Sequence, residues 1–312
     1  MKWTEWLLLG VLRGLSRLPL RVLYVLSDCL FPVVFHVVRY RRRLVQRQLA
    51  DSLPEKTAEE RRRIERQFYH NLCDYVVEIL KLQTIPIAEL KRRVRFEGFD
   101  TLQNEMRRRG KSLVFAYLGH FGNWEWLSSF ALWLEDDMQA AQIYHPLRNK
   151  QADEFFLRLR ARCGGANIPM KETLRRILSL RASGRGLMVG CIADQSPKWE
   201  AMHHWTNFLH HETSFFIGAE HLAKRLDAVV YYLHVSRPRR GYYECRVEHT
   251  CFDTTAVPDY ALTDQYAALL EQQIREEPAL WLWTHDRWKR TREEWERRRK
   301  ASDAKSRSEE KD

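Results

Sequence analysis

Apolar positions along the chain follow two periods, which predict two kinds of element. Between residues 112 and 250, short runs rich in apolar and β-branched residues predict strands: SLVFAYL, AAQIY, GLMVGCIA, AVVYYLHV and YYECRVEHT. The longer stretches among them predict helices: NWEWLSSFALWLE, QADEFFLRLRARC, KETLRRILSLRAS and SFFIGAEHLAKRL. This alternation predicts an α/β fold, a layered domain with a central, mostly parallel sheet flanked by helices. The last two strands flank RPRRG and are expected to pair antiparallel at one edge of the sheet.

The first 45 residues show a different pattern, mostly apolar from Trp6 to Val38 and then abruptly basic. Residues 22–38 reach the lower limit of roughly 17 residues for a membrane-spanning helix. Asp28, Pro32 and His36 interrupt them, however, and an interfacial amphipathic anchor fits nearly as well. A buried pair of helices is the third interpretation. We interpret residues 1–45 as a membrane anchor, and the basic cluster places the following chain on the cytoplasmic side.

Three further segments follow the anchor. Residues 46–111 are basic and predicted to be helical, because apolar side chains between Ile64 and Ile79 recur every three or four positions. Residues 112–288 form the predicted α/β core. Residues 289–312 are highly charged, and we expect this tail to be disordered.

Charge and cysteine content narrow the environment of the protein. The net charge of +11 predicts an acidic partner, which could be nucleic acid, an anionic membrane or an acidic carrier protein. No nucleic-acid-binding motif is recognisable, so nucleic acid is not an expected partner. The six cysteines form no CxxC pair and no dense framework, which favours a reducing compartment.

One predicted turn carries candidate chemistry. The segment GHFG lies between a predicted strand and a predicted helix, where open α/β sheets place their sites. Asn123 is a suitable N-cap, which puts Glu125 in the first helical turn. We expect His120 in the loop, with Glu125 reaching back to one ring nitrogen so that the other can accept a proton. The alternative is a histidine satisfied within a turn and a glutamate that interacts with the helix dipole.

A second histidine-rich stretch, HHWTNFLHHETS, raises the question of a metal site. Its histidines stand at positions 203, 204, 210 and 211, with Glu212 adjacent. This spacing matches no common zinc site, and we predict no metal and no other cofactor.

Several segments, taken together, resemble the late acyltransferases of lipid A biosynthesis, within the H-x4-D/E glycerolipid acyltransferase superfamily. GHFGNWE resembles the H-x4-E motif of that family, and ADQSPKWE resembles its Asp-Gln segment after a strand. IYHPLRN, RARCGG and WLWTHDRWK resemble further family segments in the same order, although His145 stands where an arginine is common. His210 and His211 also depart from a Phe-Gly pair of the family. The resemblance covers nearly the whole chain.

The resemblance implies an enzyme that transfers an acyl chain from a thioester to a lipid hydroxyl, without a protein nucleophile. His120 would be the general base and Glu125 the residue that orients it. Arg162 matches best the arginine that stabilises the oxyanion in the family, with Arg160 second. The residues implied to bind substrate are Asn123, Arg148, Asp194, Gln195, His285 and Arg287. Trp281, Trp283 and Trp288 are expected to pack or to anchor at an interface.

The resemblance also implies partners and a location. The expected donor is acyl carrier protein, with acyl-CoA as the alternative. The expected acceptor is an anionic lipid, most directly a lipid A precursor, with a lysophospholipid or another lipid as the alternative. The expected location is the bacterial inner membrane, with the catalytic domain on its cytoplasmic face. A non-catalytic protein that binds lipid or carrier on the same fold is the competing hypothesis.

Overall fold

The computed structural model describes the backbone of residues 3–309 and the side chains of residues 10–302. The helices of the N-terminal third are α1 (Trp3–Ser16), α2 (Leu20–Pro32), α3 (Arg42–Ser52), α4 (Ala58–Leu82), α5 (Ile87–Arg93) and α6 (Phe99–Arg108). The later helices are α7 (Trp124–Leu127), α8 (Lys150–Ala161), α9 (Thr173–Arg181), α10 (Gly218–Arg225), α11 (Ala261–Glu276) and α12 (Arg292–Glu309). A π-helical segment, η1 (Val33–Val38), continues α2. The short 3-10 helices are η2 (Ser128–Trp133), η3 (Met170–Glu172), η4 (Trp199–Ala201) and η5 (Pro278–Leu280).

The described residues contain nine strands, which form two sheets. Their bounds are β1 (Val94–Glu97), β2 (Leu113–Leu118), β3 (Met138–Tyr144), β4 (Ala166–Pro169), β5 (Gly186–Ile192), β6 (Trp205–Phe208), β7 (His211–Ser214), β8 (Val229–Arg239) and β9 (Tyr242–Cys251). Seven strands form the main sheet in the order β1-β9-β8-β2-β5-β3-β4, and β6 pairs with β7 in a separate ribbon. Strands β8, β2, β5, β3 and β4 are parallel, whereas β9 is antiparallel to β8. The predicted α/β fold with a mostly parallel sheet is confirmed.

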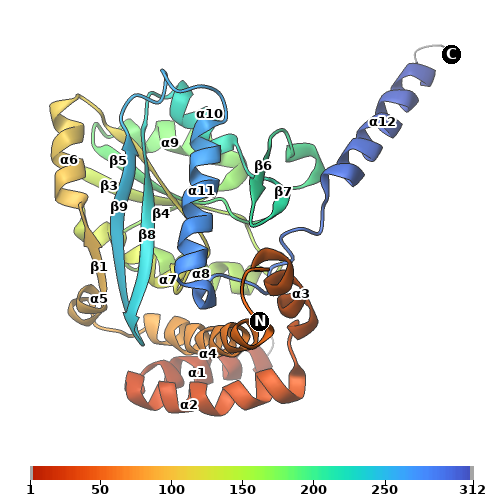
Figure 1. The fold of residues 1–312 in the computed structure, drawn as a ribbon. Coiled ribbons are helices and arrows are strands. Elements are labelled where there is room, and N and C mark those ends of the chain that lie inside the picture. Colours follow the sequence, from red (N-terminus) through yellow and green to blue (C-terminus); the bar gives the residue numbers. More distant parts are fainter. Residues whose placement is uncertain (1–2, 310–312) are drawn as a thin grey trace.

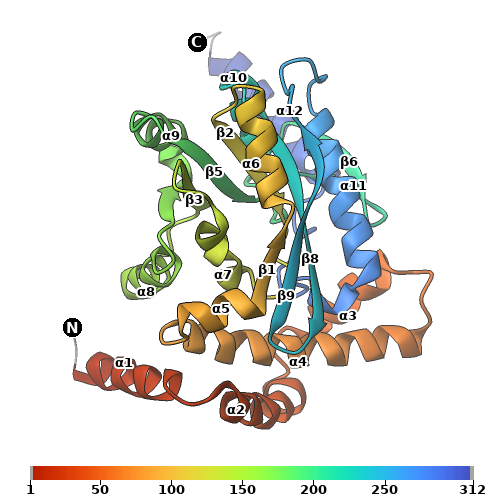
Figure 2. The same cartoon turned by 90° about the vertical axis from the view of Figure 1, so that its left-hand side faces the viewer.

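Helices cover both faces of the main sheet. Helices α10 and α11 lie on one face and α8 and α9 on the other (Figure 2). Every side chain of the central strand β2 is buried, which explains why its sequence is continuously apolar rather than alternating. Helix α4 crosses the end of the sheet where the parallel strands finish, and α1 and α2 lie on its outer side (Figure 1).

Three details differ from the sequence-based expectation. The segment 46–111 contains a strand, β1, which pairs with β9 in parallel. The β8–β9 hairpin therefore lies one strand in from the edge of the sheet. The stretch after the GHFG turn is not one long helix, because α7 ends at Leu127 and continues only as the 3-10 helix η2. A strand as short as β1, VRFE with alternating charges, carries little hydrophobic signal of its own.

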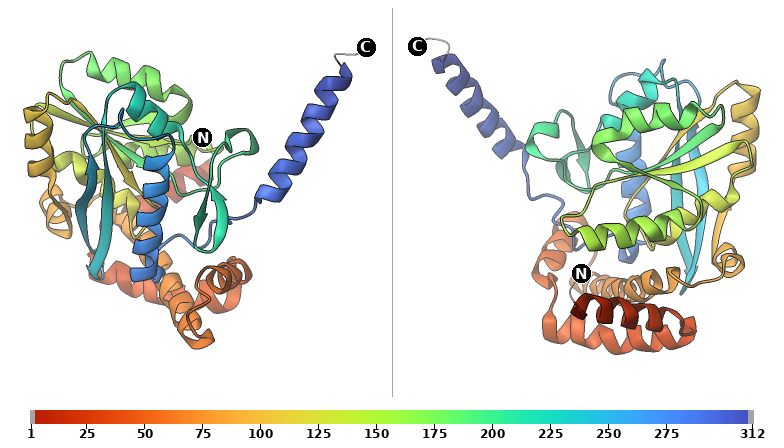
Figure 3. Two further views of the ribbon diagram at one scale, coloured as in Figure 1. Left: turned by 45° about the horizontal axis from the view of Figure 1, so that its top comes forward. Right: turned by 180° about the vertical axis from the view of Figure 1, so that it is seen from behind.

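The charged tail, expected to be disordered, contains helix α12, which projects away from the body of the protein (Figure 3). Ion pairs between residues four apart, Arg292 with Glu296 and Glu294 with Arg298, lie along its first turns. Such pairs each stabilise a solvent-exposed helix by a few tenths of a kcal/mol, roughly 0.2–0.5. Charge patterning thus favours a helix where overall composition suggested disorder.

Candidate active site

The turn after β2 holds His120 in a fixed position. Asn123 caps α7, since its side-chain oxygen accepts from the Trp126 backbone N–H at 3.1 Å, as predicted. Gly122 has a φ of +58°, and a β-carbon there would lie 2.9 Å from the Tyr243 ring. A β-carbon at Gly119 would lie 2.6 Å from a Leu270 methyl group. Only glycine fits these two positions without rearrangement, so the GHFG sequence follows from the packing of the turn.

The carboxylate that contacts His120 comes from Asp194. His120 Nδ1 lies 2.5 Å from Asp194 Oδ1, and the His120 backbone N–H donates to Asp194 Oδ2 at 2.8 Å. Strand register explains the contact. Leu118 at the end of β2 pairs with Ile192 at the end of the parallel strand β5. His120 and Asp194 each follow these paired residues by two positions, so they meet at the same edge of the sheet.

The expected contact between His120 and Glu125 is wrong. Glu125 is buried and accepts two hydrogen bonds from Arg160 of α8, at 2.8 Å from Nε and 2.6 Å from Nη2. No hydrogen bond joins Glu125 to His120 in the described part of the chain. The Asn123 cap starts a true helical turn, which directs the Glu125 side chain toward α8 rather than back toward the loop.

The Asp194 carboxylate is buried and ionised. Burial alone would raise its pKa, but the charge and hydrogen bonds of His120 and the hydrogen bond from the Trp281 indole lower the pKa to about 2. Trp281 Nε1 donates to Asp194 Oδ2 at 2.8 Å. Asp194 was expected to bind substrate and Trp281 to pack, yet in the structure Asp194 contacts the histidine and Trp281 donates to Asp194. Trp281 carries no sequence signal for this role beyond its place in the WLWTHDRWK segment.

The second ring nitrogen of His120 faces Gln195. Its Nε2 atom lies 3.2 Å from the Gln195 amide nitrogen. Because the ionised Asp194 accepts a hydrogen bond from Nδ1, Nε2 is the nitrogen with the lone pair, and this lone pair accepts from the Gln195 amide. The His120 side chain is 17% exposed, so part of the ring is open to solvent. A histidine in this state can act as a base at Nε2.

The segment from Trp281 to Arg287 supports the loop that carries Asp194. The Leu282 backbone N–H donates to the His120 carbonyl at 3.1 Å. His285 Nε2 accepts from the Ser196 backbone N–H at 3.1 Å, and burial, followed by the charge of Lys289, lowers the His285 pKa to about 4. His285 is therefore neutral near pH 7.

Arg287 is a buried cation in the same region. One of its Nη atoms donates to the Ser214 carbonyl at 2.6 Å, and burial lowers its pKa to about 10. No ion pair involves it within the described residues, although the negative charge of Asp194 acts in the opposite direction to burial on its pKa. His285 and Arg287 thus hydrogen-bond to the backbone of neighbouring segments, at Ser196 and Ser214, and neither side chain hydrogen-bonds to His120.

The remaining predicted residues fall in different places. Arg162 donates to the Ile85 carbonyl, away from Glu125, so Arg160 is the arginine that pairs with Glu125. Asn123 is fully buried, with its amide nitrogen 2.8 Å from Glu78 Oε2. Arg148 is exposed before α8 and forms no hydrogen bond or ion pair with any residue that the structure describes.

Glu78 of α4 supports the turn from behind. Its carboxylate accepts from Asn123, from the Tyr24 hydroxyl at 2.7 Å and from the Tyr243 hydroxyl at 2.8 Å. The side chain is fully buried, and burial raises its pKa. One carboxyl group therefore connects α2, the turn that carries His120 and β9. Sequence reasoning missed it, because Glu78 stands among apolar residues of a helix without any motif.

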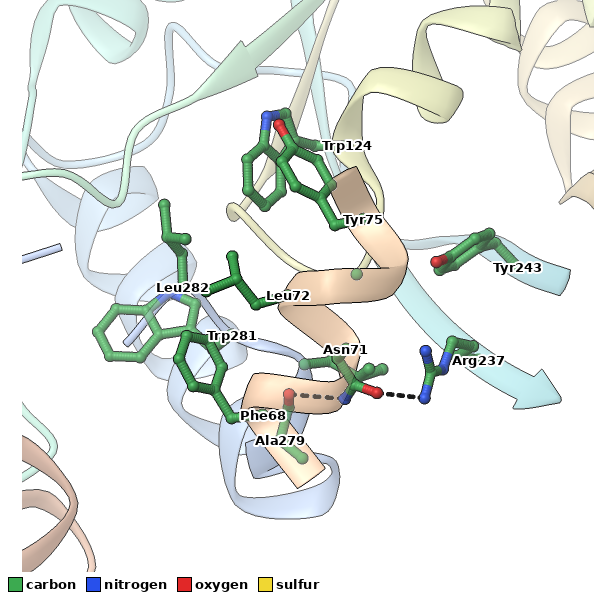
Figure 4. Close-up of a pocket in the computed structure, with 12 residues that line it drawn as sticks. Phe68, Asn71, Leu72, Tyr75, Trp124, Arg237, Tyr243, Ala279, Trp281 and Leu282 are labelled. Carbon is green, nitrogen blue, oxygen red and sulfur yellow. Dashed lines mark hydrogen bonds between the residues drawn. The ribbon is translucent and has the colours of Figure 1, made fainter. Parts of the chain in front are cut away.

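A pocket opens beside the turn (Figure 4). It is lined by Phe68, Asn71, Leu72, Tyr75, Gly122, Trp124, Arg237, Tyr243, Ala279, Leu280, Trp281 and Leu282. Tyr75 and Trp124 pack with ring centroids 4.2 Å apart, and the His120 ring meets Trp124 edge-on at 5.0 Å. The lining is mostly apolar, and Asn71 and Arg237 hydrogen-bond to one another at the end away from Trp124 (Figure 4).

The histidine-rich stretch forms the β6–β7 ribbon rather than a loop, and its side chains diverge. His204 contacts Asp264 at 2.6 Å, and His211 stacks on Trp288 with centroids 4.2 Å apart. Among the described residues, no group of three His, Cys, Asp or Glu side chains is arranged to hold a metal ion.

Comparison with known proteins identifies the family. A family model described as bacterial lipid A biosynthesis acyltransferase matches residues 1–290. A lipid A biosynthesis palmitoleoyltransferase of Escherichia coli (strain K12) is 25% identical over 293 residues, which cover 92% of this chain and 91% of the relative. A lipid A biosynthesis acyltransferase of Shigella flexneri has the same identity and coverage. With a match over nearly its whole length and a histidine at the carboxyl edge of its sheet, this chain belongs to the bacterial lipid A biosynthesis acyltransferase family.

Proposed function

We propose that this acyltransferase moves a fatty acyl chain from the thioester of acyl carrier protein to a hydroxyl group of a lipid A precursor, with His120 as the general base. The names of both relatives support a lipid A acceptor. The proposal that His120 is a general base rests on the contact between its Nδ1 atom and the ionised Asp194. It leaves Nε2 as the nitrogen with a lone pair, which a substrate hydroxyl would engage in place of the Gln195 amide.

The proposed reaction has two steps. His120 Nε2 takes the proton of the acceptor hydroxyl while the hydroxyl oxygen attacks the thioester carbonyl, which forms a tetrahedral oxyanion. The oxyanion then collapses, the carbon–sulfur bond breaks, and the His120 imidazolium returns the proton to the departing thiolate. Asp194 stabilises the imidazolium between the two steps, as a carboxylate does in histidine-based acyl transfer. The Gln195 amide, which donates to Nε2 at 3.2 Å, would give way to the incoming hydroxyl and could then bond to its oxygen.

Arg160 is the better candidate for the cation that stabilises the oxyanion. Glu125 uses its Nε and one Nη atom, and the other Nη atom makes none of the hydrogen bonds formed among the described residues. Burial alone would lower the Arg160 pKa, but the hydrogen bonds and charge of Glu125 raise it, so the guanidinium stays charged. We propose that Glu125 holds Arg160 in place, which gives the H-x4-E motif a role other than contact with the histidine.

The pocket of Figure 4 has room for about one water molecule, and we propose that it accepts no more than the carbonyl end of the acyl chain. Its aromatic wall, Tyr75 and Trp124, continues to the His120 ring. Apolar side chains on α4 and on the segment 280–282 complete it.

The charge of the protein supports the proposed donor and location. Acyl carrier proteins are acidic, and the net charge of +11 favours their binding as well as binding to anionic lipid. Coenzyme A is the alternative donor and a lysophospholipid the alternative acceptor. We place the enzyme at the bacterial inner membrane with its α/β core on the cytoplasmic face.

A reconstituted assay tests this function. Purified protein is incubated with acyl carrier protein loaded with defined acyl chains, in parallel with acyl-CoA, and with either a lipid A precursor or a lysophospholipid. Mass spectrometry of the lipids then identifies donor, acceptor and chain length. We expect transfer to the lipid A precursor and its loss in His120→Ala, by at least about 10²-fold, the usual contribution of a general base.

The matched control is His221→Ala, which removes an exposed histidine from α10. We expect this variant to retain normal turnover. Full activity of a correctly folded His120→Ala protein would refute the mechanism. Absence of transfer to every acceptor by the wild-type protein would favour a non-catalytic binding protein.

A further inference from the structure

The outer face of α2 carries an apolar stripe without a protein partner in the described chain. Side chains at Leu20, Leu23, Ser27, Phe31 and Phe35 are buried against the body. On the opposite side, α2 and η1 expose an apolar stripe, 41–76% accessible, that consists of Val22, Val25, Leu26, Val33 and Val37. Exposed apolar patches of this kind mark interaction surfaces.

The inner face of α2 is tied to the body by polar contacts along its length. The Tyr24 hydroxyl donates to Glu78, and Ser27 Oγ donates to Asp74 Oδ1 at 2.7 Å. Arg240, at the β8–β9 turn, bridges Asp74 and Asp28. These contacts hold α2 alongside α4, and both Figures 1 and 2 show the two helices in adjacent layers.

These contacts argue against a spanning helix. The stretch Leu20–Val38 is 19 residues long with a mean hydropathy of 1.7, which suffices to cross a membrane by length and composition. If α2 crossed the hydrocarbon, however, either these polar contacts would break or α4 would enter with Asp74 and Glu78. Burial of ionisable side chains in lipid is strongly unfavourable. The polar inner face therefore keeps α2 on the body, and only the outer stripe is available to lipid.

Basic side chains flank the stripe at both ends. They are exposed and form no ion pairs among the described residues: Arg13 in α1, Arg17 before α2, Arg21 in the first turn of α2, and Arg39 and Arg43 after η1. The nearby acid Asp28 is paired with Arg240. In an anionic bilayer, the apolar stripe would contact the outer part of the acyl chains, and the unpaired arginines at its two ends would contact the headgroups.

We propose that α2, η1 and the end of α1 lie flat in the surface of an anionic lipid bilayer and do not cross it. The proposal concerns attachment only and is independent of the role of His120. It has one consequence for the site. Asp74 and Glu78 of α4 face α2, whereas Asn71 and Tyr75 of the same helix line the pocket. The pocket therefore lies about one helix diameter, on the order of 10 Å, above the lipid-facing layer.

Site-directed labelling distinguishes a flat helix from a spanning one. The two native cysteines that are not buried are first removed by Cys29→Ser and Cys251→Ser. A single new cysteine is then introduced by Gly10→Cys or by Arg43→Cys. Protein in sealed, right-side-out and inverted membrane vesicles is treated with a membrane-impermeant maleimide. We expect both cysteines to react from the same, cytoplasmic side. Labelling of the two positions from opposite sides would overturn the proposal.

Vesicle binding tests the charge component. Full-length protein is sedimented with phosphatidylcholine vesicles with or without phosphatidylglycerol. We expect stronger binding to the anionic vesicles, weakened about 10- to 30-fold by Arg17→Gln with Arg21→Gln. The control variant combines Arg158→Gln on α8 with Arg175→Gln on α9, two exposed arginines away from the stripe. It should bind both kinds of vesicle normally. Equal affinity for both vesicles, or a dimer in solution that buries the stripe and excludes vesicles, would contradict the proposal.

Discussion

His120 and Asp194 are in contact, with Nδ1 and Oδ1 2.5 Å apart, although 74 residues separate them in the sequence. The acid nearest to His120 in the sequence, Glu125 in α7, pairs with Arg160 instead. Two carboxylates near the turn thus have different partners. Asp194 fixes the histidine, whereas Glu125 fixes an arginine on the neighbouring helix.

Substitution of Asp194 by Asn should reduce kcat by about 10²- to 10⁴-fold, because an amide stabilises the protonated histidine poorly and can select the wrong tautomer. KM should change little, since Asp194 is buried and does not reach the substrate side of the ring. Steady-state kinetics measure both quantities. A kcat within threefold of wild type would show that Asp194 does not orient the base.

In the Glu125–Arg160 pair, loss of the arginine should lower the stability of the protein much more than loss of the glutamate charge. Glu125 is 2% exposed and Arg160 22% exposed at the side chain. Arg160→Met leaves a buried carboxylate without a counter-charge and should lower the free energy of unfolding by about 3–5 kcal/mol. Glu125→Gln leaves a cation that can reach water and should cost less.

A double-mutant cycle by urea denaturation isolates the interaction in this pair. Combining Arg160→Met with Glu125→Leu should recover part of the loss caused by Arg160→Met alone, because no unpaired charge remains. Additive losses in the double variant would mean that the two side chains do not interact in solution.

Glu78 should contribute to stability through the three donors that it accepts. Glu78→Ala leaves the Asn123 amide and two tyrosine hydroxyls without their acceptor, at about 1–3 kcal/mol for each group that stays buried and unsatisfied. Glu78→Gln retains one acceptor oxygen and should be the milder change. Chemical denaturation measures the difference.

The control on the same helix is Glu59→Ala, an exposed position in the first turn of α4, which should change stability by about 0.5 kcal/mol or less. If Glu78→Ala were as mild as this control, the three hydrogen bonds would not stabilise the fold. Activity of the Glu78 variants also reports on whether the catalytic turn depends on its support.

His285 predicts a loss of stability in mild acid. Its pKa is lowered from 6.5 to about 4 by burial, so the unfolded chain binds a proton at a higher pH than the folded protein does. As the pH falls from about 6.5 to 4, protonation stabilises the unfolded state alone, and this residue costs up to about 3 kcal/mol. His285→Gln should flatten this part of the stability profile. An unchanged difference between wild type and variant from pH 7 to pH 4 would contradict the prediction.

Much of the fold follows from local sequence pattern. The strands β2, β3, β5, β8 and β9 have strong apolar or β-branched signals, and the periodic stripe of α4 predicts a long helix. The edge strand β1 was not predicted, and the helix expected after Asn123 ends sooner than predicted, at Leu127. Strand β1 depends on pairing with β9, and α7 and the 3-10 helix after it pack against α4 and α8 respectively, which local propensity does not encode.

At the site, the histidine, the two glycines that shape its turn and the Asn123 cap could be predicted from the sequence, because they depend on backbone geometry within a few residues. The acid that contacts His120 could be identified only from the folded chain. That choice depends on the adjacency and register of β2 and β5, which bring residues 120 and 194 to one edge, and on α8, which brings Arg160 to Glu125. Contacts between distant segments are set by how strands and helices pack, and a spacing of five residues in the sequence does not measure distance in the folded chain.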